Sequence, residues 1–320
     1  MAGMRFRRLG SVGAAAVLAL GAVTVPAQAA KRPGPAWAAL GDSYTAGVVQ
    51  AAGAEFEQPG DGCARTDLSY PELIARELGP LVSLRNVSCG GAKVADVEQA
   101  QQAPSGRPLP PLGADPDAPF APVPPQLDAV SPDTGLVTVG IGGNSLGFGP
   151  ILTECLTLGA LGGGRGTPCR DKLAAGLPGR LEQLAREYDA MLTALHAKAP
   201  SARVITVGYP QVIPADTGRC GFGDPLGFGT MTAGDLAWAR TDILDRLNAV
   251  IAKSTADHGD TFVDLYPSTE GHTVCDRAGG NNWVDGIMTS VLPLSYAFVH
   301  PNAKGHANAA ALVGHALLGS

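Results

Sequence analysis

The stretch Ala38-Ala39-Leu40-Gly41-Asp42-Ser43-Tyr44-Thr45-Ala46-Gly47 passes directly from apolar residues into a serine that is bracketed by glycines. Its apolar part predicts a buried strand, and glycine, aspartate and serine all favour the turn that ends a strand. Ser43 is therefore either a turn residue or a nucleophile held at a strand end. The rest of the chain decides between the two.

Five short, mostly apolar runs each end in turn-forming or small polar residues: 36–40, 84–88, 136–141, 203–208 and 261–265. Such runs are typical of the buried strands of a parallel sheet. The sequence contains no internal repeat.

Helical patterns lie between these runs. The longest places its apolar residues on one helix face, namely Leu181, Leu184, Ala185, Tyr188, Met191, Leu192 and Leu195. Further helices are expected at 70–78, 236–256 and 303–318. Alternating strands and helices predict an α/β, doubly wound sheet with its ligand crevice at the carboxyl ends of the strands.

Residues 1–30 have the layout of a secretory signal peptide. Arg5, Arg7 and Arg8 precede an apolar run at 12–25, and Ala27-Gln28-Ala29 supplies a small-residue cleavage site. The apolar run is too short for a membrane span. We therefore expect a secreted, extracellular monomer without a stable membrane anchor, in which residues 31–320 form a single domain.

Charge bears on the choice of partner. Without the signal segment, 20 basic residues stand against 29 acidic ones, which gives a formal charge of −9 in place of −6. An acidic chain without basic clusters is poorly suited to nucleic acid, so we expect no nucleic-acid partner.

All six cysteines follow the signal segment. An even number of cysteines in a secreted chain predicts three disulfides, whose pairing the sequence leaves open. We expect the sequential pairing, because it closes three local loops: Cys63 with Cys89, Cys155 with Cys169, and Cys220 with Cys275. Zinc is the alternative, but no two cysteines have the short spacing of a structural zinc site.

Three strand ends and one later segment carry the parts for acyl transfer. The strands end in Gly41-Asp42-Ser43, in 86–92 with its pair Gly90-Gly91, and in Gly142-Gly143-Asn144; His300-Pro301-Asn302 precedes the last helix. Acyl transfer needs a nucleophile, a base within its reach, and donors aimed at the oxyanion of the tetrahedral intermediate. Each segment alone is also an ordinary turn or helix cap. Catalysis is favoured because all four fall at the predicted crevice.

In this order the four segments resemble the SGNH hydrolase superfamily, also called GDSL esterases and lipases. The match extends from residue 38 to residue 306, and it is greatest to secreted actinobacterial lipases and phospholipases. The resemblance implies a three-layer α/β/α, flavodoxin-like sheet of about five parallel strands. It also implies a serine ester hydrolase, an esterase or lipase and possibly a phospholipase, that acts on an ester or lipid substrate and needs no cofactor and no metal.

The resemblance further implies roles for individual residues. Ser43 is the nucleophile, and His300 is the general base and acid. The amides of Ser43 and Gly91 and the side chain of Asn144 form the oxyanion hole, with Gly90 as the alternative to Gly91.

Two positions depart from the family pattern. Ala297 stands three residues before the histidine, where aspartate is usual, and Ser145 follows the asparagine of the third segment, where aspartate is common. We expect a backbone carbonyl, of Ala297 or Phe298, to hold the imidazole Nδ1–H, with Asp264 and Asp285 as alternatives. A carbonyl sets the tautomer but stabilises the imidazolium less than a carboxylate does. Ser145 is expected to affect the support of its loop.

Two other functions stay open from the sequence alone. A carbohydrate esterase that deacetylates polysaccharides shares the chemistry but needs an aromatic-lined cleft, which an aromatic content of 5% disfavours. A non-catalytic secreted binding protein of the same fold is the other, suggested by the missing aspartate. The Gly-x-Ser-x-Gly elbow of the α/β-hydrolases does not fit Ser43, which is followed by Tyr44 and then Thr45.

Several segments lie outside the four blocks. The segments 103–125 and 159–166, rich in glycine and the former also in proline, predict surface loops that rim the crevice. Trp283 and the apolar patch 291–294 belong either to an acyl pocket or, the interpretation that we favour, to the core. His272 is expected to be structural or solvated.

Overall fold

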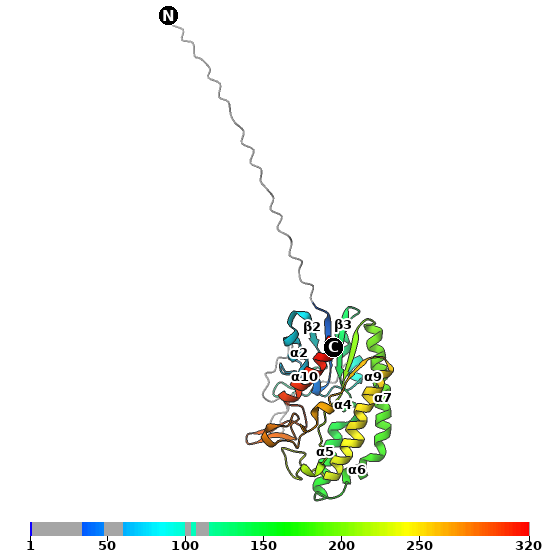
Figure 1. The fold of residues 1–320 in the computed structure, drawn as a ribbon, viewed down its shortest axis with the longest axis vertical. Coiled ribbons are helices and arrows are strands. Elements are labelled where there is room, and N and C mark those ends of the chain that lie inside the picture. Colours follow the sequence, from blue (N-terminus) through cyan, green and yellow to red (C-terminus); the bar gives the residue numbers. More distant parts are fainter. Residues whose placement is uncertain (2–33, 48–59, 100–103, 107–114, 320) are drawn as a thin grey trace. The chain divides into compact units, whose positions relative to one another are not determined.

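A five-stranded parallel sheet forms the centre of the fold (Figure 1). The computed structural model describes Met1 and residues 34–47, 60–99, 104–106 and 115–319, so nearly all of the expected signal peptide lies outside the described residues. The strands are β1 (Ala36–Gly41), β2 (Ser83–Asn86), β3 (Thr134–Gly140), β4 (Arg203–Val207) and β5 (Thr261–Val263). Their spatial order is β2-β1-β3-β4-β5, all parallel. This is the flavodoxin-like doubly wound order, as predicted.

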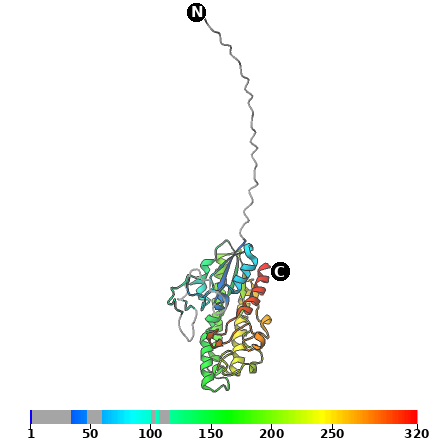
Figure 2. The same cartoon turned by 90° about the vertical axis from the view of Figure 1, so that its left-hand side faces the viewer.

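Helices cover both faces of the sheet (Figures 1 and 2). The alternation of side chains along β1 explains this arrangement, because successive residues point to opposite faces. Trp37 and Ala39 pack in one core cluster with α2 (Tyr70–Leu78) and α10 (Ala303–Leu318). Ala38 and Leu40 pack in the other cluster, which includes residues of α7 (Leu177–Lys198) and α9 (Asp245–Asp257). A strand that is apolar on both faces therefore requires the three-layer arrangement.

The remaining helices are shorter or lie near the strand ends. They are α1 (Ser43–Ala46), α3 (Ala95–Glu98), α4 (Gly143–Leu146), α5 (Phe148–Leu161), α6 (Pro168–Leu173) and α8 (Ala233–Trp238). A π-helix, η5 (Ala239–Leu244), joins α8 to α9, so the predicted helix 236–256 is one continuous helical segment with a local widening. The short 3₁₀ helices are η1 (Gly79–Leu81), η2 (Gln126–Ala129), η3 (Ala174–Gly176), η4 (Thr217–Arg219), η6 (Pro267–Thr269) and η7 (Ala278–Gly280).

Two expectations from the sequence are wrong in part. The glycine-dense segment 159–166 begins inside α5, which ends only at Leu161. The apolar patch 291–294 is not core: it joins β6 (Met288–Val291) to β7 (Leu294–Tyr296) in an antiparallel hairpin, and Leu292 at its tip is 89% exposed. A short hairpin with an apolar tip has the composition of a core segment, so composition alone misassigned it.

The structure contains three disulfides, Cys63–Cys89, Cys155–Cys169 and Cys220–Cys275, which is the sequential pairing. Cys155–Cys169 ties α5 to the start of α6. In the described ranges, no helix combines the length and apolarity that a bilayer crossing requires.

Candidate active site

Ser43 and His300 are in direct contact. Ser43 opens α1 immediately after β1, and its Oγ lies 2.7 Å from Nε2 of His300, which precedes α10. On the other side of the ring, Nδ1 lies 2.9 Å from the carbonyl oxygen of Ala297 and 3.0 Å from that of Phe298. A carbonyl oxygen can only accept, so the proton resides on Nδ1 and Nε2 is free to accept the serine proton.

The backbone before His300 has an unusual conformation. Phe298 and Val299 have φ values of 51° and 63°, in the left-handed region that a β-branched residue rarely adopts. The turn is held from two sides: the amides of 297–299 donate to carbonyls of 286–287, and the Tyr44 hydroxyl donates to the Val299 carbonyl. This turn brings two carbonyls to the same imidazole nitrogen.

Neither alternative carboxylate reaches the histidine ring. The Asp285 carboxylate accepts hydrogen bonds from the side chains of Asn282, at 2.8 Å, and Asn302, at 3.1 Å. The Asp264 carboxylate accepts from the amide of Tyr266. Among the described residues, the partners of His300 Nδ1 are thus backbone carbonyls and not a carboxylate.

The surroundings of His300 keep the ring neutral. Desolvation lowers the pKa of His300 to about 4, and the hydrogen bonds to the two carbonyls offset only part of that effect. At neutral pH the imidazole is therefore unprotonated, which is the form that a general base requires.

The three groups expected to donate to an oxyanion differ in their present hydrogen bonds. The Ser43 amide opens a helix, where amides lack intrahelical partners. The Gly91 amide makes no hydrogen bond to any described residue, whereas the Gly90 amide already donates to the Cys63 carbonyl at 3.1 Å. The Asn144 side-chain amide donates to the Ala92 carbonyl at 3.0 Å and keeps a second N–H. This contrast favours Gly91 over Gly90.

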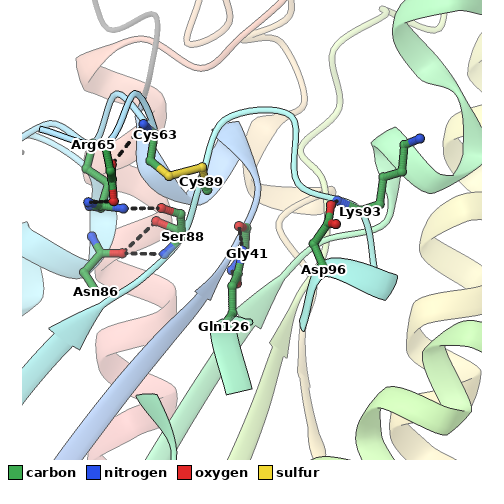
Figure 3. The surroundings of a disulfide bond; sticks show 10 residues. Gly41, Cys63, Arg65, Asn86, Ser88, Cys89, Lys93, Asp96 and Gln126 are labelled. Carbon is green, nitrogen blue, oxygen red and sulfur yellow. Dashed lines mark hydrogen bonds and ion pairs between the residues drawn. A yellow bond between two sulfur atoms is a disulfide. The ribbon is translucent and has the colours of Figure 1, made fainter. Parts of the chain in front are cut away.

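The loop that carries Gly91 is anchored beside the Cys63–Cys89 disulfide (Figure 3). Arg65 donates to the Ser88 carbonyl at 3.0 Å, and the Asn86 side chain accepts from both the amide and the hydroxyl of Ser88. These contacts hold the chain immediately before the glycine pair.

Ser145 links two of the loops. Its hydroxyl accepts from the Val94 amide at 2.9 Å, so it ties the loop after β3 to the segment after β2. This is the loop support that we expected from the residue at this position.

A cavity of about 270 Å³ opens beside the pair Ser43 and His300. Its walls include Ser43, Asn144 and His300, and they are otherwise mostly apolar: Phe148, Leu152, Val212, Leu244, Leu247 and Phe298. Trp283 and the patch 291–294 are not among the lining residues, and Trp283 instead stacks on His272 with the ring centroids 3.7 Å apart. The described part of 103–125 does not line this cavity either.

Sequence reasoning missed two residues that support the site. Gln126 makes two hydrogen bonds to the backbone of Gly41, at 2.8 and 2.9 Å, and so fixes the end of β1 (Figure 3). Tyr209 lies directly beyond β4 and lines the cavity. A search of the residues beyond every predicted strand end would have found Tyr209, whereas nothing local in the sequence marks Gln126.

Over the residues that the structure describes, no group of three or more histidine, cysteine, aspartate or glutamate side chains is placed to hold a metal ion.

Known proteins resemble the chain over most of its length. The family model described as "GDSL-like Lipase/Acylhydrolase family" matches residues 39–307. "Lipase 2" of Streptomyces coelicolor is 35% identical over 306 residues, which cover 92% of this chain and 91% of that protein. "Esterase" of Streptomyces scabiei is 31% identical over 294 residues, covering 83% and 81%.

Two solved structures share the fold. Phospholipase A1 from Streptomyces albidoflavus NA297 superimposes with a TM-score of 0.65 at 27% identity, covering 89% of this chain and 99% of that one. An extracellular lipase from Streptomyces rimosus gives a TM-score of 0.57 at 27% identity, covering 88% and 99%. Together with the site geometry, these matches show that the chain belongs to the GDSL-like lipase/acylhydrolase (SGNH) family and is an ester hydrolase.

Proposed function

We propose that this ester hydrolase cleaves esters of apolar acyl chains, with Ser43 as the nucleophile and His300 as the general base and acid. One observation carries the proposal: the 2.7 Å contact between Ser43 Oγ and His300 Nε2 lies in the wall of a largely apolar cavity. The contact supplies the activated hydroxyl, and the cavity supplies the place for an acyl chain.

The reaction proceeds in two halves. Ser43 Oγ attacks the ester carbonyl carbon while its proton passes to His300 Nε2. The oxyanion receives hydrogen bonds from the amides of Ser43 and Gly91 and from the Asn144 side chain. Collapse of the intermediate breaks the bond to the alcohol, whose oxygen takes the proton from His300. Water then attacks the acyl-serine with the same histidine as base, which releases the acid and returns the proton to Ser43.

The cavity supports an acyl chain rather than an acetyl group. A water molecule takes up about 30 Å³ of liquid, so a cavity of about 270 Å³ has room for a medium-length chain. Burying each methylene contributes about 0.8 kcal/mol, which an acetyl group does not gain. The apolar walls therefore favour lipid esters over acetylated polysaccharides.

The setting of the proposed reaction is extracellular. The signal-peptide layout at 1–30 and the three disulfides support secretion of a single catalytic domain over 31–320. The relative from Streptomyces rimosus is itself described as an extracellular lipase.

Hydrolysis of p-nitrophenyl esters from acetyl to palmitoyl tests the proposal, with the wild type compared against Ser43→Ala. We expect turnover by the wild type to peak at medium or long chains. Ser43→Ala should retain the fold, by circular dichroism and melting temperature, and lose turnover. Wild-type rates in Ser43→Ala would reject the nucleophile, and an optimum at acetyl would reject the acyl-chain assignment.

A further inference from the structure

We infer that Tyr209 is a positioning residue, whose hydroxyl joins the turn that carries Ser43 to the loop that carries Asn144. The inference rests on the proposed function, because it assigns Tyr209 a part in holding the nucleophile and an oxyanion donor. Tyr209 itself does not contact Ser43 or His300 by any hydrogen bond in the described structure.

A directional chain of hydrogen bonds passes through the Tyr209 hydroxyl. The Gly143 amide donates to Tyr209 Oη at 2.7 Å, and Oη donates to Asp42 Oδ2 at 2.5 Å. Asp42 Oδ1 accepts from the Tyr44 amide at 2.9 Å. An amide can only donate, so the tyrosine proton is left for the carboxylate. The hydroxyl thus both accepts from Gly143 and donates to Asp42, which a phenylalanine ring cannot do.

Both ends of this chain of hydrogen bonds lie next to residues of the proposed reaction. Asp42 immediately precedes Ser43, and Gly143 immediately precedes Asn144. A Cβ atom at position 143 would lie 3.2 Å from Tyr209 Oη, which shows how closely the loop approaches the hydroxyl. The hydroxyl therefore fixes the spacing between the turn after β1 and the loop after β3.

Tyr209 is itself held firmly. Its amide donates to Asn248 Oδ1 at 2.8 Å, and its carbonyl accepts from Asn248 Nδ2 at 2.9 Å. Its ring meets the edge of Tyr44, with centroids 5.0 Å apart, and Tyr44 lies 4.8 Å from the ring of His300. Asn248 on α9 thus fixes the backbone of Tyr209, and Tyr44 lies between the rings of Tyr209 and His300.

Burial makes these hydrogen bonds costly to break. Asp42 is 1% exposed, and a buried carboxylate is tolerated only with hydrogen-bond donors. Desolvation raises the pKa of Asp42 to about 6, and the hydrogen bonds from Tyr209 and the Tyr44 amide oppose that rise. Removing the hydroxyl leaves the carboxylate short of a donor and the Gly143 amide without its acceptor, so both loops can relax.

The chain offers a matched control. Tyr188, on α7, is also fully buried, but its hydroxyl has no hydrogen-bond partner among the described residues. Tyr188→Phe and Tyr209→Phe each delete one buried hydroxyl, and only the second breaks the hydrogen bonds that link Gly143 to Asp42.

The experiment measures kcat and KM of both variants on p-nitrophenyl butyrate, below their melting temperatures. We expect Tyr209→Phe to lower kcat about ten- to a hundredfold with KM within about twofold, and Tyr188→Phe to stay within about twofold in both. In a double-mutant cycle, Tyr209→Phe combined with Asn144→Ala should lose less than the product of the single losses, because both act on one donor. An unchanged kcat in Tyr209→Phe, or fully multiplicative losses, would overturn the inference.

Two further variants separate a failure of this inference from a failure to fold and from a failure of the proposed function. If Tyr209→Phe does not fold, Asp42→Asn serves in its place. Tyr209 and the Tyr44 amide donate to different oxygens of Asp42, and asparagine keeps an acceptor at only one of these two positions, so the same loss of kcat is expected. If instead Ser43→Ala keeps its activity, the proposed function fails, whatever Tyr209→Phe shows.

Discussion

The Nδ1 atom of His300 lies 2.9 Å from the carbonyl oxygen of Ala297, the residue that stands where SGNH hydrolases usually carry an aspartate. The same chain position thus orients the imidazole, through its backbone instead of its side chain. A carbonyl dipole fixes the tautomer as a carboxylate would, but it brings no negative charge to stabilise the imidazolium. Several consequences of this arrangement and of its supports can be measured.

The first concerns pH. Because the pKa of His300 lies near 4, protonation of the base should lower kcat/KM with a half-point at about pH 4, below a separate step near pH 6 at which Asp42, whose pKa burial raises to about 6, takes up a proton. Stopped assays on a soluble ester between pH 3 and 8 measure this limb. A profile with no fall in kcat/KM between pH 3 and 5 would contradict the assignment of His300.

Stability must be followed in the same experiment. The folded pKa of His300 lies below its ordinary value of 6.5, so the unfolded chain binds the proton more readily between the two values. The contribution of His300 to the free energy of unfolding is full above pH 6.5 and is lost as the pH falls through 4. Circular dichroism at each pH separates unfolding from titration of the base.

The second prediction concerns the oxyanion donors. Asn144→Ala should lower kcat about a hundred- to a thousandfold, because it removes a donor that acts on the transition state. Ser145→Ala is the matched control: it removes the acceptor of the Val94 amide and should cost roughly 1 kcal/mol of stability with a much smaller loss of kcat. Equal losses of kcat in the two variants would assign Asn144 a structural role only.

The third prediction concerns the Cys63–Cys89 disulfide, which borders the loop of Gly90 and Gly91. Replacing both cysteines by serine should cost about 2–4 kcal/mol of stability. It should also lower kcat, because the loop that carries the Gly91 amide loses its covalent anchor. The same replacement of Cys220 and Cys275 should cost stability and leave kcat nearly unchanged. Assays well below both melting temperatures make the comparison, and equal kcat values would contradict it.

The fourth prediction concerns chain-length preference. Gly149 lines the cavity, and a Cβ atom there would meet no heavy atom within 4 Å. Gly149→Leu should therefore obstruct the cavity and lower the ratio of octanoate to acetate turnover about tenfold, which corresponds to about two buried methylenes. Gly179→Leu, in the first turn of α7 and equally free of neighbours, should leave the ratio unchanged. A ratio that is the same in both variants would place the acyl chain elsewhere.

The sequence predicted the sheet well, because the central strands β1, β3 and β4 are mostly buried and are read as apolar runs that alternate with helices. It predicted the exposed hairpin of β6 and β7 poorly, because an apolar tip such as Leu292 does not differ in composition from a core segment. It also missed that the last turn of α5 extends into the segment 159–166, because glycine lowers helix propensity without preventing a helix that packing supports.

By itself, the sequence indicated which residues to propose for the chemistry, because a serine, an asparagine and a histidine at strand ends and before the last helix are expected at one edge of a parallel sheet. Only the tertiary structure decided which groups serve them. The bond that occupies the Gly90 amide, the two carbonyls at His300, and the bridge from Gly143 through Tyr209 to Asp42 all depend on hydrogen bonds. A hydrogen bond requires the right direction within a few tenths of an ångström, and for residues far apart in the chain only the packed fold sets that geometry.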